Sequence, residues 1–367
     1  MNQPSSVSPP FDKKFFASAN SSNGFQNEFI SCFGEGSGVD RLYILKGGPG
    51  TGKSYFLRVL GRWAERQGYQ TTYYCCSSDP NSLDGLRVEK TGQPCIGLID
   101  GTAPHVWEPH APGVREEIIN LGIFWNSDTL RRHADEITSL SQQKAACYDM
   151  AYRFLCACGQ SVSAADLMIT PSLKEDQLNA LAKRLTKGVR AGAAFREIPA
   201  YRSCVGMTGC VCLDTYEQMA ARDGTEIIYA DDSYGLGYRL TEKVYALLRE
   251  KQVNVMVSRH PVHHHKIDGL YVPKGGLCLL VGEDTACRYP HRLLSLHRYL
   301  DASTFKTVRG EVRHCLKLAS EMKACAVQSM KKAGTHHFAL ETIYASAMDF
   351  EAKGKFEKAF CRRLFGD

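Results

Sequence analysis

The chain has 367 residues, of which 44% are hydrophobic and 23% charged, a composition typical of a globular protein with sizeable cores. This length predicts two or three domains. No unbroken apolar run is long enough to cross a bilayer, and the start, MNQPSSVSPPFDKK, lacks the hydrophobic segment of a secretory signal. We therefore expect residues 1–14 to be a flexible tail, and the protein to be cytoplasmic, with no membrane partner.

The net charge of +6 is spread along the chain, so nucleic-acid binding has no support from the sequence. The 15 cysteines show no C-x-x-C spacing, and an odd number without an export signal indicates free thiols in a reducing compartment. Segment 260–266, HPVHHHK, is expected to be a surface loop rather than a metal site, because no second set of ligands accompanies it.

The first strong motif lies in residues 41–68, RLYILKGGPGTGKSYFLRVLGRWAERQG. An apolar run over 42–45 predicts a buried strand, and apolar residues at helical spacing after Ser54 predict an amphipathic helix. The turn between them fits the pattern G-x-x-x-x-G-K-[ST] of a phosphate-binding loop. The expected nucleotide-binding residues are Gly47, Gly48, Pro49, Gly50, Thr51, Gly52, Lys53 and Ser54.

Each residue type in this turn suits the binding of a nucleoside triphosphate. Glycines let the backbone curl until successive N–H groups point inward, and the following helix adds the positive end of its dipole. Lys53 is expected to reach the β- and γ-phosphates, and the Ser54 hydroxyl to join the coordination of Mg²⁺. The expected cofactors are ATP and Mg²⁺; GTP is disfavoured only by the lack of an N-K-x-D motif.

A carboxylate for the metal is expected at the end of a second buried strand. In PCIGLIDGTAPH the strand covers 96–99, and Asp100 stands at its carboxyl end, where open α/β sheets bind ligands. We assign Asp100 and Lys53 to catalysis. Asp100 is also expected to bind Mg²⁺, directly or through water. Many ATPases have a glutamate at the next position, but Gly101 stands here, and no arginine finger can be named. Four nearby residues could orient the attacking water in place of that glutamate: Thr102, His105, Glu108 and Asp79.

An internal repeat relates the two halves of the chain. A shift of 184 places Asp84-Gly85-Leu86 on Asp268-Gly269-Leu270, RLYIL on TEIIY, and CIGLID on LLVGED. A shift of 175 places IINLGIFWN (118–126) on LLSLHRYLD (293–301), so the second copy lacks nine residues in between. Helical stretches follow at 128–158 and 303–333, each ending in further helix. We expect two tandem domains, 15–195 and 196–367, forming an intramolecular pseudo-dimer.

The second copy of the loop, in IYADDSYGLGYRLTEKV (228–244), has lost the lysine. Gly52-Lys53-Ser54 align with Leu236-Gly237-Tyr238, and Gly47-Gly48 align with Asp231-Asp232. Two carboxylates would then stand where phosphate lies and would repel it. We expect a degenerate loop that does not bind nucleotide in the usual way, in a domain that offers groups to the first site or senses its state.

The motifs KGGPGTGKS and IDGTAPH, the latter followed by EIINLGIFW, together with the repeat, resemble an uncharacterised bacterial family of tandem P-loop NTPases of the AAA-like ATPase type. The resemblance spans most of the chain. It implies an α/β fold of two P-loop NTPase-like three-layer αβα domains, with mainly parallel sheets and added helices. The family's second copy commonly keeps a P-loop, and this sequence departs from that. The resemblance implies nucleotide binding at Gly47 to Ser54 and names no substrate.

Three functions are consistent with these motifs. The leading expectation is a Mg²⁺-dependent ATPase whose hydrolysis of ATP is coupled to a conformational change. The runner-up is a kinase for a small molecule or nucleotide, although segment 101–117 holds only Arg115 where a kinase lid usually has several arginines. The third is a nucleotide-gated binding module with little turnover and an unknown protein partner.

Overall fold

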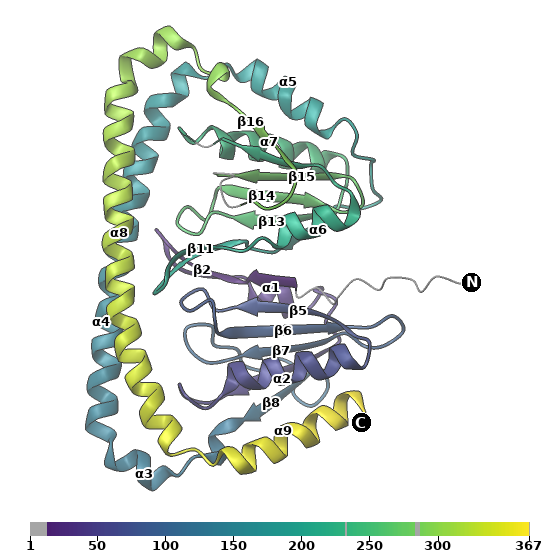
Figure 1. Ribbon diagram of the computed structural model, residues 1–367, viewed down its shortest axis with the longest axis vertical. Coiled ribbons are helices and arrows are strands. Elements are labelled where there is room, and N and C mark those ends of the chain that lie inside the picture. The colour runs from purple at the N-terminus through teal and green to yellow at the C-terminus, as the bar shows by residue number, and fades with distance from the viewer. Residues whose placement is uncertain (1–12, 232, 283–286, 367) are drawn as a thin grey trace.

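The computed structural model describes residues 13–231, 233–282 and 287–366, which form an α/β protein with two mixed six-stranded sheets (Figure 1). In spatial order the first sheet consists of β1 (Lys13–Phe16), β5 (Gln70–Cys75), β6 (Leu83–Glu89), β7 (Ile96–Asp100), β4 (Arg41–Lys46) and β8 (Glu116–Asn120). The second consists of β9 (Glu197–Pro199), β13 (Val255–Arg259), β14 (Ile267–Val272), β15 (Leu277–Val281), β12 (Ile227–Ala230) and β16 (His291–Leu294). Strand β1 begins inside the segment expected to be a tail, and residues 1–12 lie outside the described ranges.

The two sheets have the same topology, strand for strand. In each sheet the third strand is antiparallel to both of its neighbours, and every other pair is parallel. A β-bulge also recurs at the same place, between Tyr74 and Cys75 in the first sheet and between Ser258 and Arg259 in the second. The internal repeat expected from the sequence is therefore present in the architecture of the two sheets.

Two strand alignments expected from the sequence are wrong. Leu45 pairs with Ile119 and Ala230 pairs with Leu294, at equivalent positions of the two sheets, so RLYIL corresponds to EIIYA rather than to TEIIY. The N–H of Gly101 donates to the carbonyl of Leu45 at 3.0 Å, and the N–H of Gly282 donates to that of Ala230 at 3.2 Å, so these two contacts are equivalent. Asp100 is therefore matched by Val281, and CIGLID corresponds to GLCLLV rather than to LLVGED. The reason is a shorter turn between β14 and β15 than between β6 and β7. The second half has an apolar side chain where the first has a carboxylate.

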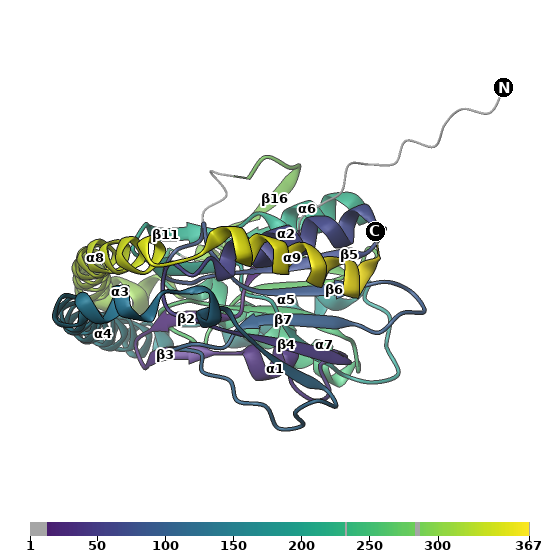
Figure 2. The same ribbon diagram turned by 90° about the horizontal axis from the view of Figure 1, so that it is seen from below.

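Two long helices connect the halves and run side by side along one edge of the molecule (Figure 2). Helix α4 (Ala134–Ile169), preceded by α3 (Ser127–Arg132), leads from the first half to the second. Helix α8 (Ala302–Ser346) returns in the opposite direction. Both extend beyond the expected stretches 128–158 and 303–333. We call α4 and α8 the arms.

Each arm delivers a helix to the opposite half of the molecule. After α4, helix α5 (Glu175–Thr186) packs against α7 (Leu236–Glu250) of the second half. After α8, helix α9 (Phe350–Phe365) packs against α2 (Lys53–Arg66) of the first half. The two halves thus exchange helices. Helix α5 belongs to the expected domain 15–195 but covers the second sheet, and α9 belongs to the expected domain 196–367 but covers the first.

The halves also share an apolar core. One cluster of buried residues combines Phe33 and Ile44 of the first half with Tyr229 and Leu280 of the second. Two short helices lie in this layer, α1 (Phe29–Phe33) and α6 (Thr215–Asp223). The remaining elements are the hairpins β2 (Ser18–Ser21) with β3 (Gly24–Asn27) and β10 (Ser203–Gly206) with β11 (Gly209–Cys212), and the 3₁₀ turns η1 (Leu121–Phe124), η2 (Thr170–Ser172) and η3 (His297–Tyr299).

The backbones of the halves meet in a symmetric contact. The N–H of Phe16 donates to the carbonyl of Tyr201 at 2.8 Å, and the N–H of Tyr201 donates back to Phe16 at 3.1 Å. Phe16 ends β1 and Tyr201 lies just after the equivalent strand β9, so the exchange marks an approximate two-fold axis. Over the described part of the chain, no helix combines the length and the apolar character needed to span a bilayer.

We expect Phe360→Ala to destabilise the protein by about 3–5 kcal/mol, because it opens a cavity between α9 and the first sheet. The ring of Phe360 is buried, with its centroid 5.1 Å from that of Tyr43 and 5.6 Å from that of Phe56. Urea unfolding measures the change. Phe338→Ala, which removes a half-exposed ring from α8, is the control and should have a much smaller effect. Equal, small effects would mean that α9 contributes little to the first half.

We expect Glu28→Gln to destabilise the contact between the halves by about 1–2 kcal/mol at neutral pH. Although burial raises the pKa of Glu28, hydrogen bonds from His264, Ser31 and Tyr201 lower it from 4.5 to about 2. The stabilisation is therefore fully present above pH 4.5 and is lost as the pH falls towards 2. Urea unfolding between pH 3 and 7 tests this, with the exposed Glu321→Gln as control. A difference between wild type and Glu28→Gln that does not vary with pH would contradict it.

Candidate functional site

Residues 47–54, here called loop 47–54, connect the end of β4 to the start of α2. Gly50 and Gly52 have φ angles of 71° and 80°, in the left-handed region that favours glycine. The hydroxyl of Thr51 donates to the carbonyl of Gly48 at 2.9 Å and fixes the turn between them, in which Pro49 lies. Helix α2 starts at Lys53, immediately after Gly52, so its unpaired N–H groups face the loop.

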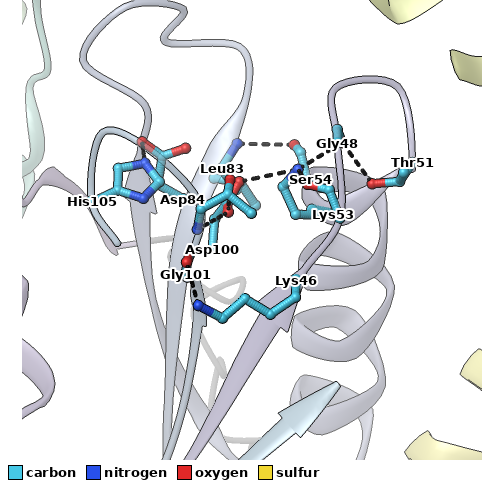
Figure 3. A network of polar contacts seen from close by, with 12 residues as sticks. Lys46, Gly48, Thr51, Lys53, Ser54, Leu83, Asp84, Asp100, Gly101 and His105 are labelled. Atoms are coloured by element: carbon cyan, nitrogen blue, oxygen red, sulfur yellow. Dashed lines mark hydrogen bonds and ion pairs between the residues drawn. The ribbon is translucent and has the colours of Figure 1, made fainter. Parts of the chain in front are cut away.

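The structure brings Lys53 and Asp100 together (Figure 3). The amine of Lys53 lies across loop 47–54 and donates to the carbonyls of Gly47 at 2.7 Å and Gly48 at 2.9 Å. It also lies 3.5 Å from Oδ2 of Asp100, which ends β7 on the strand next to β4. The other oxygen of Asp100 accepts hydrogen bonds from the backbone N–H and the hydroxyl of Thr102, at 2.9 and 2.6 Å.

The oxygen atoms at this edge of the first sheet suit a hard cation such as Mg²⁺. The hydroxyl of Ser54 accepts a hydrogen bond from the N–H of Leu83 at 2.9 Å and keeps a lone pair for a ligand (Figure 3). Asp100 supplies a carboxylate from the adjacent strand end. Within the described ranges, no group of three or more His, Cys, Asp or Glu residues could hold a metal by itself. Mg²⁺ here would therefore need phosphate and water as its other ligands.

The four residues considered in place of a catalytic glutamate make other contacts in the structure. Besides Thr102, which binds Asp100, His105 is buried with its Nε2 3.3 Å from Oδ2 of Asp84. Burial lowers the pKa of His105, but the carboxylates of Asp84 and Asp100 raise it overall. Glu108 is exposed and pairs with Lys46 at 2.6 Å, and Asp79 caps a turn at the N–H of Asn81.

Helices from the second half of the chain cover loop 47–54. A Cβ atom added to Gly48 would lie 2.9 Å from the ring of Tyr344, and one added to Gly50 would lie 3.0 Å from Cα of Glu341 and closer still to its carbonyl oxygen. A Cβ on Gly52 would lie 2.9 Å from Nζ of Lys353. The end of α8 and the start of α9 therefore pack directly on the glycines. No local motif predicts this contact; only the repeat could have suggested it.

Beside Gly52, a groove of about 450 Å³ is lined by residues of both α2 and α9. Tyr55 and Lys353 line it, and Lys353 is buried in an ion pair with Glu357. The groove gives loop 47–54 an open, partly aromatic flank, while α8 covers the glycines themselves.

The second loop differs from the first in length and in charge. In each loop a left-handed glycine immediately precedes the helix, so Gly52 corresponds to Gly235 and the expected alignment of Gly52 with Leu236 is wrong. Six residues (46–51) separate Leu45 from Gly52, but only four (231–234) separate Ala230 from Gly235. Asp231 accepts hydrogen bonds from the N–H and hydroxyl of Ser233 at 2.8 and 2.6 Å, so it caps its own turn. Asp232 lies outside the described residues.

An ion pair lies against the second loop. A Cβ on Gly235 would lie 3.0 Å from a carboxylate oxygen of Asp166, which stands near the end of α4. The amine of Lys266, which is buried, donates to that carboxylate. The carboxylate at the second loop is thus neutralised within the protein.

The segment HPVHHHK is not a surface loop, contrary to expectation. Val262 and His263 are buried, because the segment lies under the two arms, and Val262 packs with Ala151 of α4 and Met330 of α8. Burial, together with the positive charges of Lys266 and His265, lowers the pKa of His263 to about 3. The cysteines are free thiols, about half of them buried.

Comparison of the chain with protein-family models, with curated proteins and with solved structures finds no match. The function is therefore inferred from the chemistry of loop 47–54. Its curled backbone, the start of α2 and the Lys53 amine all offer hydrogen-bond donors and positive charge, which suit an anion.

We expect Gly50→Ala to destabilise the protein by about 1–3 kcal/mol more than Gly113→Ala. Both glycines have a positive φ, 71° and 75°, so alanine is strained at each. At Gly113 the added methyl group meets nothing within 4 Å, whereas at Gly50 it overlaps the backbone of Glu341. Urea unfolding of the two variants isolates the contact between the loop and α8. Equal destabilisation would show that α8 yields without cost.

Proposed function

We propose that the protein binds ATP with Mg²⁺ at loop 47–54 and hydrolyses it, on a fold of two tandem P-loop NTPase-like αβα domains of which only the first is active. Membership of the bacterial tandem P-loop family is part of this proposal. The observation that supports it most directly is the position of Lys53, whose amine lies across the glycine-rich turn with the Asp100 carboxylate 3.5 Å away.

Each group of the site has a task in this proposal. The N–H groups of the loop and of the first turn of α2 bind the phosphates. Lys53 exchanges its two carbonyl partners for phosphate oxygens and offsets the negative charge that develops on them. Ser54 and Asp100 would hold Mg²⁺, which when bound adds further positive charge at the β- and γ-phosphates.

The second half supports the first without a nucleotide of its own. It has Val281 in place of Asp100, a shorter loop, and the pair of Asp166 with Lys266 where an anion would lie. The end of α8 rests on Gly48 and Gly50, so a change at the phosphates reaches the arms through direct contact. We infer that hydrolysis is coupled to a shift of the arms.

A nucleotide-gated binding module is the second candidate, favoured by the same contact of α8 with the loop, since binding alone could then move the arms. A kinase is less well supported. Arg115, the one arginine of segment 101–117, donates to the carbonyls of Phe33 and Val39 and pairs with Glu116. It is held within the first half and is not free to act in a lid.

We expect Lys53→Ala to lower the rate of ATP hydrolysis at least 100-fold, because it removes the charge that stabilises the transition state. The measurement uses radiolabelled ATP with Mg²⁺ on the full chain, and separates free phosphate from any phosphorylated acceptor. Lys187→Ala, an exposed position on the other half, is the control. Truncation at residue 200 would not be a clean test, because it removes α9 from α2.

Three outcomes separate the candidates. Free phosphate that depends on Lys53 supports the ATPase. Binding of ATP by the wild type without turnover favours the gated module, and label on an acceptor favours the kinase. A wild type that fails to bind ATP would overturn the proposal.

A further inference from the structure

The two arms carry an acidic residue at equivalent positions, and each of these residues lies against one of the two loops. Helices α5 and α9 begin at Glu175 and Phe350, a shift of 175, and the same shift relates Asp166 on α4 to Glu341 on α8. The carboxylate of Asp166 lies against Gly235 of the second loop, and the backbone of Glu341 lies against Gly50 of the first, with its carboxylate near the N–H of Gly50. The carboxylate at each loop therefore comes from an arm that starts at the other half.

The surroundings of Glu341 keep its carboxylate charged. It lies 3.5 Å from Nε2 of His337, one turn earlier on α8. A hydrogen bond with His337 lowers the pKa of Glu341, as do the charge of Lys53 and a hydrogen bond from the N–H of Gly50, although burial opposes them. The side chain is 42% exposed, so water reaches it. Asp166 differs, because the buried amine of Lys266 neutralises it.

The backbone that carries Glu341 is fixed. Tyr344 packs on Gly48, the backbone of Glu341 itself packs on Gly50, and α9 is anchored in the first core through Phe360. Lys144 approaches from α4, and burial together with the charge of Lys53 lowers the pKa of Lys144, although Glu341 opposes this. The Glu341 side chain can turn, but its Cα stays at the loop.

The other carboxylates around the loop are engaged. Asp100 pairs with Lys53 and binds Thr102, and Asp84 pairs with His105. Gly101, after the β7 strand, supplies no side chain. Glu341 is the ionised, half-exposed carboxylate that the described residues place against loop 47–54.

We propose that Glu341 is the catalytic carboxylate of the first site: it holds and deprotonates the water that attacks the γ-phosphorus of ATP. This inference rests on the ATP hydrolysis proposed above. The second half thus completes the active site of the first through α8.

The chemistry follows from charge. A triphosphate takes over the N–H of Gly50, and the carboxylate, repelled by the γ-phosphate but tethered by α8, stays one water away. Water between two anions donates a hydrogen bond to each. The water oxygen then bonds to the γ-phosphorus as the bond from that phosphorus to the β–γ bridging oxygen breaks. ADP leaves with that electron pair, and the proton of the water passes to Glu341 and then to solvent.

The experiment compares Glu341→Gln with wild type, using ATP and Mg²⁺ on the full chain. Two quantities are measured: ATP affinity and the single-turnover rate of phosphate release. We expect the rate to fall at least 100-fold, because the amide cannot accept the proton, while affinity is unchanged or becomes tighter as a negative charge is removed. Glu351→Gln, an exposed glutamate on α9, is the matched control and should leave both unchanged. Glu341→Asp should retain part of the rate.

The possible outcomes test the role of Glu341 separately from the proposed hydrolysis of ATP. If Glu341→Gln hydrolyses ATP at the wild-type rate while Lys53→Ala does not, the catalytic role of Glu341 is overturned and ATP hydrolysis stands. Tighter binding with an unchanged rate would make Glu341 an internal competitor of phosphate, which also overturns the role. If the wild type binds ATP without turnover, the proposed ATPase and the role of Glu341 both fall.

Discussion

The packing of α9 against α2 is the contact on which the candidate site depends. Helix α9 buries Phe360 and Cys361 in the first core, and so fixes the end of α8 above loop 47–54. Burial of apolar surface is the main source of this attachment, but it is non-directional. The position of α8 over the loop depends on the glycines, because a side chain at Gly48 or Gly50 would overlap α8. The curled backbone of the loop and the approach of the second half thus require the same residues.

The two halves show how one architecture can carry different polar groups at equivalent positions. Strand order, bulge and exchanged helices are the same in both, because they depend on apolar faces and backbone pairing. The chemistry depends on a few polar positions, and those have diverged: Val281 stands for Asp100, and Lys266 reaches its loop from the segment after β13 rather than from the start of a helix. The pair of Lys266 with Asp166 connects α4 to the second loop, whereas the first loop offers unpaired donors to an anion.

Local features were predictable from the sequence, and contacts between distant segments were not. The strand, turn and helix over 41–66 follow from apolar spacing and the glycine pattern, and Asp100 was placed at a strand end by the same means. The strand alignment was wrong at CIGLID because the turn before this strand differs in length between the two halves, and the spacing of apolar residues does not reveal the length of a turn. The histidine segment was misjudged because its burial comes from the arms. Glu341 was missed because nothing in its surroundings links it to a loop almost 300 residues earlier.

The exchange of helices also sets the order in which the protein becomes complete during synthesis. The first sheet and loop 47–54 leave the ribosome early, but the helix that covers α2 spans residues 350–365 and emerges after every other described element. Until then α2 has its contacts with the first sheet but lacks those of Phe56 with Phe356 and Phe360. That part of the helix therefore stays uncovered while residues 67–349 are made, and the first half is complete only when α9 arrives.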